Sequence, residues 1–412
     1  MPEINSGDTA WLLASAALVL FMTPGLAAFY GGMVRRKNVL DTTLQSFFAM
    51  GLIGVLWAVV GYSLAFTTIE GPLAPFIGGL SFAGLNGIGG TAHELAGSIP
   101  QSVFAMFQGM FAIITVGLIT GAVAERMKFK AYVAFALLWS LFVYSPLAHW
   151  VWQPSGWLFK LGALDFAGGT VVHISSAAAA VAAALVLGRR RGYGKDKFHP
   201  HNLTMTVMGA GILWFGWFGF NAGSALTAGD LAGTAFLNTN IAAAAAVLTW
   251  TGIEWMRAGK PTALGAASGA VAGLVAVTPA CGYVEPWAAL LIGAIAGVAC
   301  FYGLSIKGKL KIDDALDVLG IHGVGGTLGA ILTGVFATSA VNSAITGGAL
   351  YGNVNQLWIQ LVGVVAAWAF SFVVSMGLLL GIKAVMGLRV DEDAEIRGLD
   401  LAEHNEEGYI LD

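Results

Sequence analysis

Two histidines lie within apolar, glycine-rich stretches of the sequence, where an ionisable side chain is costly. His173 ends the run DFAGGTVVH, which begins at Asp165, and His322 lies in the run DVLGIHGVGG, which begins at Asp317. One such histidine could be a hydrogen-bonded packing residue, but two in matching runs predict a pair of facing imidazoles that donate and accept hydrogen bonds. A metal site is the weaker interpretation, because no Cys, Asp or Glu stands at helical spacing to supply a third ligand.

Asp165 and Asp317 each begin an Asp-x-x-Gly sequence just before the segment that carries a histidine. A carboxylate at that position can accept hydrogen bonds from the free N–H groups of the first helical turn, so we expect both aspartates to cap their helices. For Asp165 a second role is open, since its negative charge near the outer mouth of a pore would favour a cation there.

A second set of candidates combines aromatic rings with one hydroxyl, near the predicted outer ends of helices. Its members are Phe107, Phe111, Trp152, Trp217, Phe220 and Ser224. Phe107 and Phe111 share a helical face by their i, i+4 spacing, and Ser224 lies four residues after Phe220. Such rings are usual in the interfacial belt of membrane proteins. The alternative interpretation is a cation–π cage in which the hydroxyl accepts a hydrogen bond.

The composition indicates what kind of elements must position these residues. Of the 412 residues, 57% are apolar and only 10% are charged, and the formal net charge is −3. A soluble protein has about 25% charged residues, and a protein that binds nucleic acid needs excess positive charge. The sequence therefore excludes a soluble enzyme, a disordered chain and a nucleic-acid binder. It predicts an all-α polytopic membrane protein.

Eleven stretches are long and apolar enough to cross a bilayer, which needs about 20 apolar residues per helix. They lie near 8–33, 42–68, 100–123, 129–148, 168–188, 200–222, 233–255, 262–279, 285–305, 317–337 and 354–385. Of the 20 Lys and Arg residues, all except Lys160 fall in the segments that follow odd-numbered stretches. Basic residues mark the cytoplasmic side, so we expect the N-terminus outside and the C-terminus inside.

The two histidine runs open the fifth and the tenth stretch, and the first and sixth stretches echo each other in Phe-Tyr-Gly-Gly (29–32) and Phe-Asn-Ala-Gly (220–223). A lag of five helices inverts the second copy in the membrane, and inverted repeats place the transport site near the midplane at their interface. The predicted architecture is therefore a transmembrane body, residues 1–387, with repeats at about 8–188 and 200–337 and one extra helix at about 354–385.

Residues 388–412 form a cytoplasmic tail of different composition. It holds nine acidic residues, Asp391, Glu392, Asp393, Glu395, Asp400, Glu403, Glu406, Glu407 and Asp412. A solvated terminus would explain the charge, but interspersed Leu, Val and Ile residues favour docking onto the body or onto a partner.

The remaining histidines lie at the ends of the predicted helices or outside them. We expect His93, His199, His201 and His404 to be solvated, and His149 to lie at the membrane interface.

Six motifs in order give the chain a family resemblance. AFYGGMVRRKN, FQGMFAIIT with AERMKF, SPLAHWVW, LDFAGGTVVH, WFGWFGFNAGSA and DVLGIHGVGG resemble the ammonium transporter (Amt/MEP/Rh) family, on its Amt side, from about residue 8 to residue 400. The resemblance implies an ammonium transporter of prokaryotic type in the cell membrane, which is not an enzyme and needs no cofactor. It also implies a homotrimer with one pore per subunit. A cytoplasmic PII signalling protein is the implied partner, and the tail is the implied regulatory region.

The resemblance also assigns roles to individual residues. Phe107, Trp152 and Ser224 would form the outer recruitment site for ammonium, or for its analogue methylammonium. Phe111 and Phe220 would be stacked rings that close the pore, His173, His322 and Trp217 would line it, and Asp165 would support the recruitment region.

Three alternatives remain open from the sequence. A gas channel of the Rh type, which would pass ammonia or CO2, is the nearest, and the predicted cation site at Trp152 and Ser224 argues against it. A non-conducting ammonium sensor would normally carry a larger signalling domain than the short tail seen here. An intramembrane enzyme would need a nucleophile with a base, or a metal set, and neither is found in the sequence.

Overall fold

The computed structural model describes residues 3–410 and contains helices, turns and loops but no strand within that range. The α-helices are α1 (Ser6–Met33), α2 (Val39–Leu56), α3 (Tyr62–Phe66), α4 (Gln101–Val123), α5 (Phe129–Trp139), α6 (Ser145–Trp152), α7 (Trp157–Leu161), α8 (Ser175–Leu187), α9 (Leu203–Gly223), α10 (Asp230–Ala258), α11 (Ala263–Val277), α12 (Pro286–Leu310), α13 (Val324–Phe336), α14 (Val354–Met386), α15 (Glu392–Arg397) and α16 (Leu399–His404). Four π-helical turns interrupt or open them: η2 (Trp57–Gly61), η4 (Ser140–Tyr144), η5 (Gly169–Ile174) and η6 (Leu319–Gly323).

Ten helical segments among the described residues are long and apolar enough to cross a membrane. They coincide with ten of the eleven predicted stretches, so the all-helical membrane fold is confirmed. The other stretch, predicted at 262–279, is the shorter apolar helix α11 of 15 residues. It ends two residues before Pro279, which has no N–H to continue the helical hydrogen bonds.

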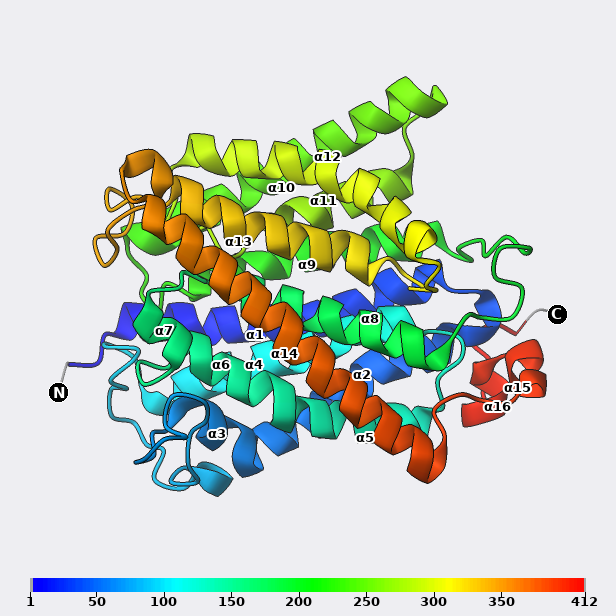
Figure 1. Ribbon diagram of the computed structural model, residues 1–412, viewed down its shortest axis with the longest axis horizontal. Helices are drawn as coiled ribbons and strands as arrows, with labels where there is room; N and C mark the ends of the chain where they lie inside the picture. The colour runs from blue at the N-terminus through cyan, green and yellow to red at the C-terminus, as the bar shows by residue number, and fades with distance from the viewer. Residues whose placement is uncertain (1–2, 411–412) are drawn as a thin grey trace.

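The long helices run side by side along the longest axis of the molecule, and α14 crosses them obliquely (Figure 1). The helix α1 begins at one end of this bundle, and the tail helices α15 and α16 lie at the other end. We call these the outer and the inner end, after the orientation predicted from the basic residues.

The first and sixth membrane helices, α1 and α9, pack antiparallel along much of their length. Gly209 of α9 lies against the backbone of Phe29, and Gly219 lies against Leu18 and Ser15. A Cβ atom at either glycine would clash with α1, so these glycines allow the close approach.

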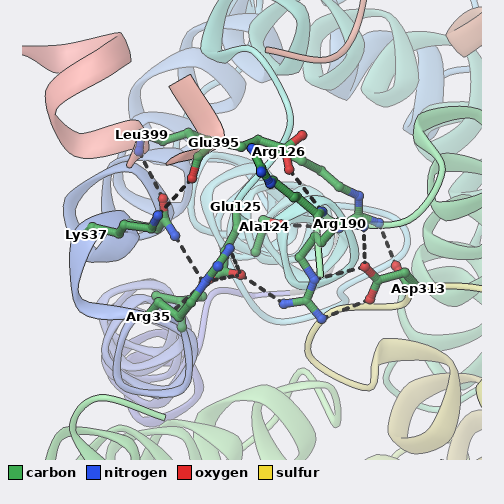
Figure 2. Close-up of polar contacts among 12 residues, drawn as sticks. Arg35, Lys37, Ala124, Glu125, Arg126, Arg190, Asp313, Glu395 and Leu399 are labelled. Carbon is green, nitrogen blue, oxygen red and sulfur yellow. Dashed lines mark hydrogen bonds and ion pairs between the residues drawn. The ribbon is translucent and has the colours of Figure 1, made fainter. Parts of the chain in front are cut away.

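A network of buried charges joins the loops at the inner end (Figure 2). Glu125 accepts hydrogen bonds from Arg35 and from Arg190, and Arg190 also binds Asp313 through two nitrogens. Burial alone would raise the pKa of Glu125, but Arg190 and Arg35 hold it below its ordinary value. Arg126, buried beside them, donates to backbone carbonyls of three loops. Because partners come from four loops, the network fixes the loops relative to one another.

The tail docks onto the body beside this network. Lys37 donates to the backbone carbonyls of Glu395 and Ile396, at 2.9 and 2.6 Å. The amide oxygen of Asn38 accepts from Leu399 N–H at 2.9 Å, while its amide nitrogen donates to Glu125. Leu388, Val390 and Leu399 are buried. The docking predicted from the apolar residues of the tail is therefore seen within one chain; Asp412 lies outside the described residues.

Two of the histidines expected to be solvated are instead enclosed. His93 is only 5% exposed and stacks on Phe104 at 4.5 Å between ring centroids. His404 pairs with the buried carboxylate of Asp41 at 3.1 Å. A nearby ring or carboxylate compensates each imidazole for lost water. For His404 the sequence could not show this, because Asp41 lies far away along the chain.

Candidate functional site

The two histidines of the matching runs face each other inside the bundle. Nδ1 of His173 lies 3.2 Å from Nδ1 of His322, and the ring centroids are 5.2 Å apart. Both rings are buried. One Nδ1 must donate and the other accept, so one imidazole keeps an unprotonated Nε2 and the other keeps an Nε2–H. The pair therefore offers one acceptor and one donor to a neighbouring molecule, and Nε2 of His173 has no hydrogen-bond partner among the described residues.

Both histidines lie within π-helical turns, His173 in η5 and His322 in η6. Such turns are rare and occur often at functional sites. Hydropathy does not reveal these turns, since both segments are apolar and show no usable periodicity.

The outer turn is capped by Asp165, as predicted. One carboxylate oxygen accepts from the N–H groups of Gly168 and Gly169, at 2.8 and 2.6 Å. The other accepts from Thr170 N–H at 2.8 Å, from Val171 N–H at 3.2 Å and from the Thr170 hydroxyl. Gly168 has φ of 120°, a conformation that glycine adopts without strain. The carboxylate of Asp165 is therefore saturated and holds the turn that carries His173.

The prediction that Asp317 caps the inner turn is wrong. The cap is Asp314, whose carboxylate accepts from Leu319 N–H at 2.7 Å. Asp317 has φ of 65° and pairs instead with Lys307 at 2.6 Å. Burial and the neighbouring charge of Asp317 raise the pKa of Asp314 to about 6. The left-handed backbone at Asp317 turns its side chain away from the helix start, which the Asp-x-x-Gly pattern could not reveal.

The histidine pair lines a narrow apolar cavity of about 10 Å³. Its lining residues are Met22, Leu26, Phe29, Ile114, Leu118, Val172, His173, Leu213, Trp217, Phe220, Val271 and His322. The ring of Trp217 stacks on His173 at 5.5 Å between centroids, and its Nε1–H donates to the Thr278 hydroxyl at 2.9 Å. Trp217 therefore lies beside the histidines with its own polar atom already bonded.

Two phenylalanine rings separate this inner cavity from a second, outer one. Phe111 lines the outer cavity and Phe220 lines the inner cavity, and their ring centroids are 4.2 Å apart. Phe220 in turn stacks on His173 at 6.1 Å. The two packed rings thus form a partition between the two spaces.

The outer cavity has a volume of about 110 Å³ and combines rings with polar oxygens. It is lined by Phe66, Leu95, Phe104, Gln108, Phe111, Trp152, Phe166, Ser224 and Leu226. The hydroxyl of Ser224 donates to Phe220 O at 2.8 Å, so its free lone pairs can only accept. Trp152 Nε1–H donates to Asp165 O at 3.0 Å, which links this cavity to the capped turn.

Two placements differ from the predicted set. Phe107 is fully buried, packs against Phe111 at 4.9 Å and is not among the residues that line the outer cavity. Gln108, which the sequence analysis missed, does line the cavity, and its buried amide oxygen has no hydrogen-bond partner among the described residues. A glutamine between two phenylalanines of an apolar helix was the available signal.

A profile of the Ammonium Transporter Family matches residues 10–409. The chain belongs to this family. It is therefore a multi-pass membrane protein of a transporter family and not an enzyme. An ammonium transporter of Bacillus subtilis (strain 168) is 50% identical over 407 residues, which cover 98% of this chain and 99% of the relative.

Solved structures of the family have the same fold. The crystal structure of Saccharomyces cerevisiae Mep2 is similar with a TM-score of 0.90 and 39% identity, covering 95% of this chain and 89% of Mep2. A structure described as a sensor Amt protein is similar with a TM-score of 0.87 and 32% identity, covering 97% of this chain and 98% of that one.

Proposed function

We propose that this family member moves ammonium across the membrane by stripping it of a proton and conducting ammonia. The observation that carries the proposal is the facing pair His173 and His322 inside an apolar cavity, behind the rings of Phe111 and Phe220. A bare cation pays heavily to enter such a space, whereas neutral ammonia does not. A substrate that can lose its charge is therefore the one that suits this pore.

Recruitment takes place in the outer cavity. Trp152 presents an aromatic face to a cation, and the oxygens of Ser224 and Gln108 can accept its hydrogen bonds. Ammonium donates four directed hydrogen bonds and potassium donates none, so oxygen acceptors among rings favour ammonium. Phe107 supports the position of Phe111 from behind in this proposal.

Deprotonation takes place at or below the partition of Phe111 and Phe220. Loss of water lowers the pKa of an amine there, because desolvation disfavours its charged form. Ammonia then passes the histidine pair, which supplies one donor and one acceptor, and Trp217 holds the ring of His173 in place. The proton either returns outward or crosses separately along the imidazoles, and in the second case transport carries current.

The assembly and control of the protein are proposed on the family resemblance and on the docked tail. The transmembrane body (1–387) forms a homotrimer with the N-terminus outside, and the tail (388–412) is a cytoplasmic regulatory region. Its contacts with Lys37 and Asn38 support a regulatory role, since a PII-type signalling protein that binds the tail would also act on the inner loops.

A second candidate function is an ammonium sensor that does not conduct. The similarity to the structure described as a sensor Amt protein favours it, since that similarity covers nearly the whole of both chains. Both functions share the outer site, and they differ in whether substrate passes the partition.

Current recording on purified protein in liposomes, combined with methylammonium uptake, tests the proposal. Ammonium-dependent transport that excludes potassium is expected from the wild type. The double variant H173A/H322A should lose ammonium transport or admit potassium, and retention of both properties would overturn the role of the histidines. Trp152→Leu should alter recruitment with the fold intact. A wild type that binds ammonium without transporting it would establish the sensor instead.

A further inference from the structure

His149 lies in α6, three residues before Trp152, and has no place in the transport path described above. Its imidazole is completely buried. Nδ1 lies 3.0 Å from the carbonyl oxygen of Ala65, and Nε2 lies 2.9 Å from that of Ala74. The Ser155 hydroxyl is 3.2 Å from Nε2. Both ring nitrogens thus lie within hydrogen-bond distance of carbonyls in a segment more than 70 positions earlier in the chain.

The ring is hydrogen-bonded to the earlier segment in each of its protonation states. A neutral imidazole donates either from Nδ1 to Ala65 O or from Nε2 to Ala74 O, and an imidazolium donates to both carbonyls. Ala65 lies in the last turn of α3, where helical carbonyls have no partner within the helix. With its hydrogen on Nδ1, His149 therefore supplies a donor that the end of α3 lacks.

The two segments joined by His149 each carry a residue in the wall of the outer cavity. Phe66, the residue after Ala65, lines that cavity and packs edge-on against Phe104 at 5.1 Å. Trp152, one turn after His149 on α6, lines the same cavity. The helices α3 and α6 are in contact (Figure 1). The imidazole is thus a fixed link between the Phe66 wall and the Trp152 wall.

We infer that His149 is a positioning residue of the outer site, which sets the apparent affinity for ammonium by fixing the distance between the Phe66 wall and the indole of Trp152. The inference rests on the proposed recruitment role of that cavity. Ring–cation and hydrogen-bond contacts depend steeply on distance, so loosening one wall weakens binding of the cation. The partition of Phe111 and Phe220 and the histidine pair are not touched by His149, so the maximal rate should change little.

The same loop offers a matched control. Trp150 Nε1–H donates to Phe76 O at 2.8 Å, two residues beyond Ala74. Phe76 does not line the outer cavity. Trp150→Phe therefore removes one hydrogen bond between α6 and the same loop without acting on either wall.

The test is the concentration dependence of ammonium current in liposomes for the wild type, His149→Gln, His149→Leu and Trp150→Phe. We expect His149→Leu to raise KM about fivefold or more with the maximal current within about twofold. His149→Gln, which can still donate to Ala65 O, should recover part of the loss. Trp150→Phe should keep the wild-type KM. An unchanged KM in both His149 variants, or an equal shift in Trp150→Phe, would overturn the inference.

A double-mutant cycle separates positioning from simple stability. In a Trp152→Leu background, His149→Gln should have no further effect on KM, because the wall that it positions is gone; additive shifts would contradict the link. If His149→Leu fails to fold, the KM of His149→Gln alone is compared with that of the wild type. A wild type without current would count against the proposed function, whereas a conducting wild type with unaffected His149 variants would count against this inference alone.

Discussion

At the outer turn, Asp165 receives four backbone N–H groups and the hydroxyl of Thr170 on its carboxylate. At the inner turn, Asp314 receives Leu319 N–H on one oxygen, while its second oxygen is buried without a hydrogen-bond partner among the described residues. Both caps hold a π-helical turn with a histidine, yet only the inner one lies beside other charges, Asp317 and Lys307. The outer turn is thus held by hydrogen bonds to one saturated carboxylate. The inner turn is held by a carboxylate that lies beside other charged side chains and has a raised pKa.

The largest expected effect comes from emptying the outer cap. Asp165→Ala leaves buried N–H groups without acceptors, at about 1–3 kcal/mol for each strongly affected group, and should lower the free energy of unfolding by about 5 kcal/mol. Ammonium current should vanish because the turn that carries His173 is released. Asp165→Asn keeps one acceptor oxygen, so its free energy of unfolding and its current should lie between those of the wild type and of Asp165→Ala. Unfolding in detergent and current recording measure both, and a stable, conducting Asp165→Ala would refute the account of this cap.

The next effect concerns the buried network at the inner end. Glu125→Gln removes the charge that pairs with Arg35 and Arg190. The buried guanidinium of Arg190 then keeps only the carboxylate of Asp313, so the free energy of unfolding should fall by about 4 kcal/mol. Glu285→Gln is the matched control, since that carboxylate bonds only exposed groups at the outer end and should show little change. Equal unfolding temperatures for the two variants would contradict the difference between the two ends.

The inner cap itself should show a pH-dependent effect. The pKa of Asp314, raised to about 6, means that folding favours its protonated form, so this residue makes the protein less stable as pH rises from about 4 to 6, by at most about 3 kcal/mol. Asp314→Asn should remove this contribution, so that the stability of the variant falls less than that of the wild type as pH rises from about 4 to 6. Unfolding temperatures between pH 4 and 7 measure it; a variant with the wild-type slope would show that another group is responsible.

The smallest effect belongs to the tail. The hydrogen bond to Asp41 raises the pKa of His404, so the bond stabilises the docked tail fully below about pH 6.5 and is lost as pH rises through the raised value. The contribution is about 1 kcal/mol, the usual net value for one hydrogen bond. Protease cleavage after Arg397 should therefore increase at alkaline pH in the wild type, relative to a detached peptide of the same sequence. The His404→Gln variant should be cleaved at the same rate below about pH 6.5 and at alkaline pH, again relative to the detached peptide.

Much of the fold could be predicted because it follows from hydropathy and charge alone. The apolar stretches predicted the membrane helices, and the matching runs predicted that His173 and His322 face each other. The assignment of Asp317 failed because three aspartates crowd one loop, and only the backbone conformation decides that Asp314 faces the helix start. Gln108 was missed, and His149 was expected only at the membrane interface, for a related reason. Their contacts involve residues far along the chain or a cavity that no spacing rule describes.

The π-helical turns have one further consequence. An α-helix turns about 100° per residue, and a π turn holds one residue more than the α turn that it replaces. Each of η5 and η6 therefore shifts the phase of the helix that follows it by about one residue. The direction of each imidazole is thus set by residue count as much as by residue type. Deletion of a single residue from 170–172 would leave His173 in the sequence and aim its ring elsewhere. An alignment that tolerates a one-residue gap here would therefore count both histidines as conserved in a protein where they no longer face each other.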